Sequence, residues 1–223
     1  MVLCCSRISV IIRSNICVSR VKCANKYAVF KNRNDWIKPF ETFSGEAVYR
    51  KKAKSGLFKL YGAFDASSFE LIQEDINEPN GSHFKLNNNN FYLNGSYQGV
   101  LNDNWSVFGG LSYTHANNKL NIINSDIDNT ENSLHTKVKF KNRISNRLKL
   151  YFGAEYFATD FDEKYEDETI EKVNYGYNNN IAAAYAEADI FISKKLAFKT
   201  GLRGEYSELF KDFTIAPRLS LAY

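Results

Sequence analysis

Residues 134–156 read LHTKVKFKNRISNRLKLYFGAEY, and this stretch decides the fold. Apolar and polar residues alternate from Leu134 to Phe140, and after a polar turn they alternate again from Leu148 to Tyr156. A period of two is the pattern of a β-strand with one apolar and one polar face. Three lysines follow one another on the polar face, and they could be desolvated only at a high cost in free energy. The polar face must therefore contact water, and the apolar face must contact lipid or a protein partner.

The same alternation predicts nine strands along the chain. They are expected at residues 43–49, 58–66, 91–101, 105–113, 134–140, 148–156, 182–192, 196–202 and 215–223. Runs of about nine to twelve residues have the length that a tilted strand needs to cross a bilayer. The fold class that follows is all-β, an antiparallel up-and-down meander of nine to ten strands that forms a partial outer-membrane β-barrel.

The connections between the predicted strands differ in length. Short polar turns are expected near residues 51–55, 101–104, 143–146 and 193–195, and hydrophilic loops of about twenty residues are expected between them. Short periplasmic turns and long external loops are typical of outer-membrane barrels. The Lys-rich turns should therefore face the periplasm and the acidic loops the exterior. A tenth strand from Val21 to Lys31 would give the even number usual in complete bacterial barrels.

The amino-acid composition is consistent with a chain that crosses a membrane with β-strands and not with helices. Aromatic residues make up 15% of the chain although the mean hydropathy is −0.41. No run of eighteen apolar residues occurs, which excludes a transmembrane helix at the sequence level. Aromatic residues are expected towards the strand ends, as in the girdles of membrane barrels; examples are Tyr49, Phe58, Phe91, Tyr113 and Tyr156.

Charge and cysteine set the first residues apart. Residues 1–34 contain basic but no acidic residues, so the remaining chain is net acidic despite the overall charge of +4. The remaining chain thus has no basic stripe for nucleic acid. All four cysteines, without a C-x-x-C spacing, lie in residues 1–25. Residues 1–25 are predicted to be a poorly structured leader, with a signal, a misplaced start or a strand all left open, and residues 26–223 to be the barrel segment.

The fourth predicted hairpin allows a register to be stated. If its turn is centred on Lys194, Asp189 faces Lys199 and Tyr185 faces Arg203. Opposite charges across two strands stabilise such a register by about 0.2 to 1 kcal/mol. The sequence therefore predicts that these pairs share the polar face.

Candidate sites are few. One acidic stretch, expected in a loop, is a weak candidate for calcium because calcium prefers clustered oxygen ligands; its residues are Asp160, Asp162, Glu163, Glu166, Asp167 and Glu168. The stretch lacks EF-hand spacing, so the favoured assignment is no metal. His135 near Ser133 is the only catalytic candidate, and the protein is expected not to be an enzyme. No cofactor is expected, and the ligand is not indicated.

Two further stretches carry a family resemblance. Residues 187–207 together with APRLSLAY at 216–223 resemble the barrel of TonB-dependent outer-membrane receptors of the Bacteroidota type, as do Asn32–Trp36 and Lys38–Pro39. The resemblance covers residues 30–223. It implies a 22-stranded barrel, a plug inside it and energy supplied through a TonB box. This chain shows neither a plug segment nor a TonB box, so it reads as a fragment of the C-terminal barrel.

Three hypotheses follow. The first is a receptor barrel segment for uptake of a nutrient or siderophore across the outer membrane. The second is a small complete ten-stranded barrel with a structural or adhesive role, and the third a soluble β-protein. The expected partners are outer-membrane lipid, the TonB complex only within a full receptor, and a small-molecule ligand, but not nucleic acid.

Overall fold

The computed structural model describes residues 6–12, 16–22, 34–169 and 172–223, with the backbone alone described for the first two segments. These residues form one antiparallel sheet whose strands follow one another in sequence order. The strands are β1 (Ser6–Ile12), β2 (Ile16–Lys22), β3 (Asn34–Ala53), β4 (Gly56–Gln73), β5 (Ser82–Val100), β6 (Trp105–Ile122), β7 (Ser125–Arg143), β8 (Leu148–Asp167), β9 (Val173–Phe191), β10 (Ala197–Ser207) and β11 (Asp212–Ala222).

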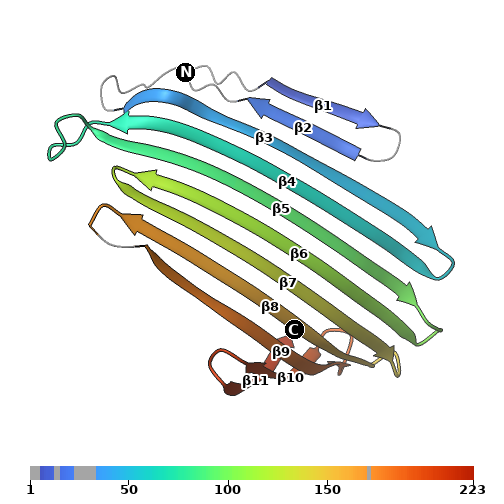
Figure 1. The fold of residues 1–223 in the computed structure, drawn as a ribbon. Helices are drawn as coiled ribbons and strands as arrows, with labels where there is room; N and C mark the ends of the chain where they lie inside the picture. Colours follow the sequence, from blue (N-terminus) through green and yellow to red (C-terminus); the bar gives the residue numbers. More distant parts are fainter. Residues whose placement is uncertain (1–5, 13–15, 23–33, 170–171) are drawn as a thin grey trace.

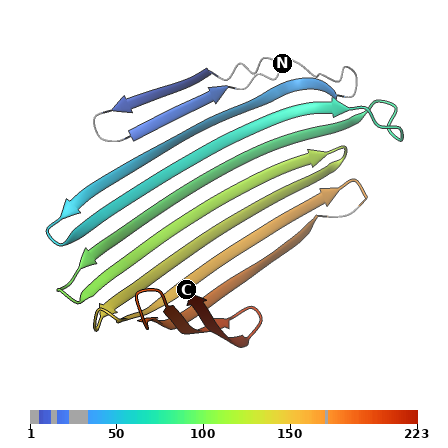
Figure 2. The same ribbon diagram turned by 180° about the vertical axis from the view of Figure 1, so that it is seen from behind.

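The sheet is a curved meander. Strands β3 to β8 run side by side as long arrows, and β10 and β11 turn out of their plane at the far edge (Figures 1 and 2). Each strand from β3 to β10 pairs with the next over most of its length. The ladder between β3 and β4 shifts register near Trp36 and Lys38, which bends β3 close to its beginning.

The predicted fold class is confirmed, and the nine predicted strands correspond to β3 to β11. The predicted strand lengths are wrong for β3 to β9, which have 18 to 20 residues. The predicted twenty-residue loops are wrong for the same reason, because most of their residues continue the strands. The connection between β6 and β7, for example, consists of Ile123 and Asn124 alone.

The N-terminal predictions are only partly within the described residues. Strands β1 and β2 pair over seven residues, and β2 meets β3 at Ile16 and Cys17. The proposed tenth strand at 21–31 lies almost entirely outside the described residues. The division into a leader at 1–25 and a barrel segment at 26–223 stays a prediction.

The predicted register of the fourth hairpin is confirmed. Asp189 pairs with Lys199 and Tyr185 pairs with Arg203 across β9 and β10. The ammonium group of Lys199 nevertheless binds a different carboxylate, since its Nζ lies 2.9 Å from Oε2 of Glu187. The pleat of the strand therefore determines on which face of the sheet Lys199 lies. The length of its side chain determines which carboxylate it binds.

Packing differs from that of a globular domain. Among the described apolar residues only Leu71 and Ala183 are buried, at 8% and 6% exposure. Large apolar side chains such as Leu111, at 52%, are open on the surface. No helix in the described residues is long and apolar enough to cross a membrane. The sheet is thus a single layer without its own hydrophobic core, and its apolar face needs cover from outside.

The register can be tested by cross-linking. In a background with the four native cysteines replaced by serine, Asp189→Cys with Lys199→Cys should cross-link with a short bifunctional reagent, because these positions are opposite and share a face. Asp189→Cys with Phe198→Cys is the control, since Phe198 points to the other face. Preferential cross-linking of the control pair would show a register one residue away from that described here.

Candidate functional site

The outward face of the sheet carries an apolar belt next to the short turns. On β8 the outward residues are apolar from Leu148 to Ala158. At about 3.3 Å per residue and a tilt of about 40°, this run spans a height of about 25 Å, which is the apolar band of an outer-membrane barrel. Exposed large apolar side chains of the belt include Phe43, Tyr49, Phe58, Leu60, Phe64, Phe91, Leu93, Leu111, Tyr113, Val138, Phe152, Tyr156, Leu202, Tyr206, Ile215 and Leu219.

Aromatic residues mark the upper edge of the belt. Tyr156 and Tyr206 both pair with Ala182, and Tyr206 also pairs with Phe213, so an aromatic row crosses β8 to β11. The row lies in the middle of β8, not at its end as predicted from the sequence, because the strand continues beyond it. This position is where a girdle residue should lie if lipid ends at the row.

Beyond the aromatic row the outward face becomes polar. We call this region the polar extension, and its residues are Asn87, Asn89, Asn117, Lys119, Asp126, Asp128, Asp160, Asp162, Lys164 and Glu166. They alternate with inward residues just as the belt residues do. The extension therefore continues the wall of the sheet by about nine residues past the belt, at a level where its side chains contact water.

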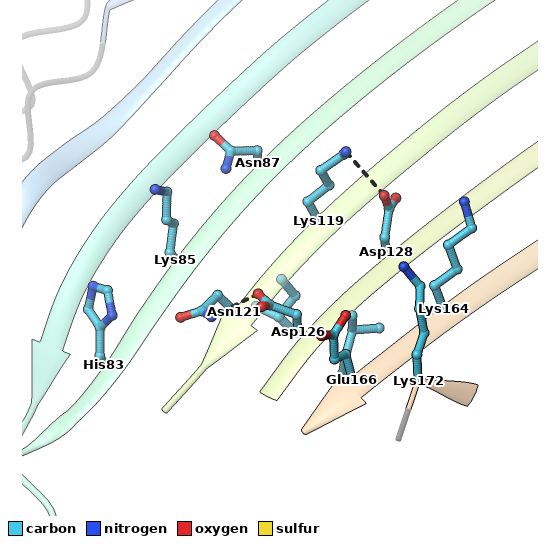
Figure 3. Close-up of a pocket in the computed structure, with 12 residues that line it drawn as sticks. His83, Lys85, Asn87, Lys119, Asn121, Asp126, Asp128, Lys164, Glu166 and Lys172 are labelled. Atoms are coloured by element: carbon cyan, nitrogen blue, oxygen red, sulfur yellow. Dashed lines mark hydrogen bonds and ion pairs between the residues drawn. The ribbon is translucent and has the colours of Figure 1, made fainter. Parts of the chain in front are cut away.

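A pocket lies within the polar extension across β5 to β8 and reaches Lys172, which comes just before β9 (Figure 3). In it Lys119 forms an ion pair of 3.1 Å with Asp128, while Lys164 and Lys172 lie on the other side of this carboxylate. Burial acts to raise the pKa of Asp128, but hydrogen bonds from Lys119 and Asn117 outweigh it and hold the pKa below its usual value. Basic and acidic groups are mixed in this pocket, so it has no pronounced charge of one sign.

The six candidate calcium residues do not lie in a loop. Five belong to β8, where Asp160, Asp162 and Glu166 point outward and Glu163 and Asp167 point inward; Glu168 follows in the turn. Asp167 accepts hydrogen bonds from the backbone of Thr169 and from the side chains of Ser125, Thr169 and Tyr165, which lower its pKa to about 2. The described residues contain no group of three or more ligands that could hold a metal ion. The pleat thus separates carboxylates that are adjacent in sequence, and the assignment of no metal stays a prediction.

The two residues of the catalytic candidate, Ser133 and His135, do not contact each other. His135 stacks on Phe157, with ring centres 3.9 Å apart. The hydroxyl of Ser133 donates a 2.8 Å hydrogen bond to Glu131 instead of contacting the imidazole. Without a bond from serine to histidine, these two residues lack the geometry of a nucleophile and its base.

The inward face carries a connected group of charges across β7, β8 and β10. Glu155, with its side chain only 8% exposed, binds Lys137 and lies 2.8 Å from Nη1 of Arg203. Arg203 also binds Glu205 at 3.0 Å. Two cations and two carboxylates therefore neutralise one another on this wall. Sequence alternation indicated that these residues point inward, but not that they join strands 48 residues apart.

A curved antiparallel sheet with a 25 Å apolar belt outside and paired charges inside defines the wall of a membrane-spanning β-barrel. A family model of the outer membrane protein beta-barrel family matches residues 82–216, and the chain belongs to this family. Its location is the outer membrane. No curated protein matches the sequence.

Among solved structures, the chain is similar to the outer membrane transporter YddB from Escherichia coli. The TM-score is 0.65 at 12% sequence identity, and the match covers 96% of this chain and 34% of that one. The chain thus spans about a third of the length of the transporter. At this identity the similarity shows a shared barrel fold.

The belt predicts a difference between the two faces. Leu111→Lys places a charge in the middle of the belt and should lower the free energy of unfolding in lipid vesicles by about 2 to 4 kcal/mol. Ser112→Lys, on the inward face of the same strand, should change it by less than about 1 kcal/mol. Urea titration in vesicles gives both values, and equal losses would contradict the assignment of faces.

The inward charges predict an unequal effect of two glutamates. Glu155→Gln leaves Lys137 and Arg203 without their shared partner and should destabilise the protein by about 1 to 3 kcal/mol. Glu205→Gln removes a more exposed carboxylate with one partner and should cost less than about 1 kcal/mol. Unfolding in vesicles at neutral pH measures both, and the reverse order would refute the central role of Glu155.

Proposed function

We propose that this chain forms part of the barrel of a TonB-dependent outer-membrane receptor that takes up a nutrient or siderophore. The observation that carries the proposal is the match of 96% of the chain to part of an outer membrane transporter. The receptor-like stretches at 187–207 and 216–223, which form parts of β9, β10 and β11, support it.

The inward face suits such a role. It presents Lys137, Glu155 and Arg203 on rigid strands rather than on mobile loops, so their positions are defined before any molecule enters the barrel. The polar extension raises the wall above the lipid and would surround an incoming ligand. We propose that the protein binds and conducts its ligand without changing it chemically, and that its partners are outer-membrane lipid, the TonB complex of a full receptor and a small molecule, but not nucleic acid.

The proposal is tested by uptake in the organism that carries the gene. A deletion strain should lose growth on at least one iron-siderophore or nutrient source in a panel on which the parent grows. Uptake of that compound by the parent should stop when the proton gradient is collapsed or TonB is removed, because import through such receptors is energised. Undiminished uptake without TonB would contradict the proposal and favour the alternative of a barrel with a structural or adhesive role.

A further inference from the structure

The inward face near the short turns gathers cations around one aromatic ring. The Nζ atoms of Lys139, Lys141 and Lys199 lie 5.0, 5.8 and 5.8 Å from the centre of the Tyr151 ring. The Nζ atom of Lys149, on the same strand as Tyr151, lies 4.8 Å from the ring centre of Phe191. We call these four lysines the lysine cluster. They come from β7, β8 and β10, and all four lie on the inward face near the short turns.

The lysine cluster differs from the rest of the inward wall in its charge balance. Higher on the wall, Lys137 and Arg203 are matched by Glu155 and Glu205. In the cluster, Lys199 shares Glu187 with Arg218, at 2.9 and 3.7 Å. Lys139, Lys141 and Lys149 have no ion pair within the described chain.

Among the described residues, the other carboxylate beside these lysines in the ladder is that of Asp189, which lies between Lys149 and Lys199 in the register. The cluster with Arg218 thus has more cations than carboxylates. The excess is local, because the chain beyond residue 34 is net acidic.

Aromatic contacts hold the ammonium groups in position. A cation over the face of a tyrosine ring is attracted by the quadrupole of the ring, which limits the freedom of the long lysine side chains. Gly153, the ladder partner of Lys139, leaves room for a second tyrosine: a Cβ atom there would lie 2.8 Å from the hydroxyl of Tyr185. The ammonium groups are thus accompanied by a further hydrogen-bonding group on a rigid sheet.

We propose that the lysine cluster is a binding site for a small multivalent anion that carries phosphate or carboxylate groups. Like charges around one ring repel each other over distances shorter than the Debye length of about 8 Å, and an anion among them removes this repulsion. Each ammonium group offers three donors for short, charge-assisted hydrogen bonds. The site is formed by the barrel wall alone and does not require import energised by TonB. Its test can therefore fail without refuting the proposed function, and the reverse is also true.

The test is a titration of the full chain, folded in an uncharged detergent, with inorganic pyrophosphate and, in a second arm, with citrate. Calorimetry should show saturable binding of at least one of them. K139Q/K141Q should weaken it about tenfold or more, because two charge-assisted bonds are lost. The matched control K85Q/K164Q removes two charges from the outward face and should change the affinity less than about twofold.

Absence of saturable binding of both anions would overturn the proposal, and so would equal weakening in the two double variants. A second measurement needs no variant. In the wild-type protein, the bound anion should protect Lys139 and Lys141, but not Lys85 and Lys164, from acylation followed by mass spectrometry. Uniform protection of all four lysines would show general charge attraction and would also overturn the site. Protection confined to Lys139 and Lys141 would support it even if K139Q/K141Q failed to fold.

Discussion

The structure depends on one constraint: in a hydrocarbon environment every backbone N–H and C=O group needs a partner inside the protein. The ladders satisfy it for the strands inside the sheet, β4 to β10, because each of these strands bonds both of its sequence neighbours. A sheet built this way has two faces and needs no core. The outward face can then be filled with side chains suited to lipid, which explains why so few apolar residues are buried. The free side of β11 has no partner strand in the described chain, and lipid would require one there.

Strand identity and face could be predicted from the sequence because period-two alternation is local. The hairpin at 134–156 and the register of Asp189 with Lys199 needed only counting from the turns. Strand length could not be predicted in this way. Beyond the aromatic row the outward face is polar and the inward face mixes polar residues with aromatic ones such as Phe161 and Tyr165. These hydrophilic segments therefore read as loops, although the ladder continues through them. The turn at Ile123 could not be predicted from the sequence either. Ile123 adopts a φ of 57°, a conformation that β-branched residues rarely take.

For the charged residues, too, the sequence predicts the face of the sheet on which each side chain lies but not its ion-pair partner. Alternation correctly placed Lys137, Glu155 and Arg203 on one face. It could not identify Glu155 as the link between β7 and β10, because this depends on how three strands line up. Lys199 lies opposite Asp189 but binds Glu187, since a lysine side chain is long enough to reach a diagonal neighbour. Partners therefore follow from side-chain reach, while faces follow from the backbone.

The pleat also explains why a dense acidic sequence does not make a site here. From Asp160 to Asp167 the carboxylates are divided between the two sides of one strand, so residues that are close in sequence are separated in space. The reverse holds for the lysine cluster, whose residues are spread over 61 positions from Lys139 to Lys199. Three of its four lysines, Lys139, Lys141 and Lys199, meet at Tyr151. In a meander, groups that can act together come from the same level of neighbouring strands. A functional site in such a wall is thus defined by ladder rows rather than by runs of sequence.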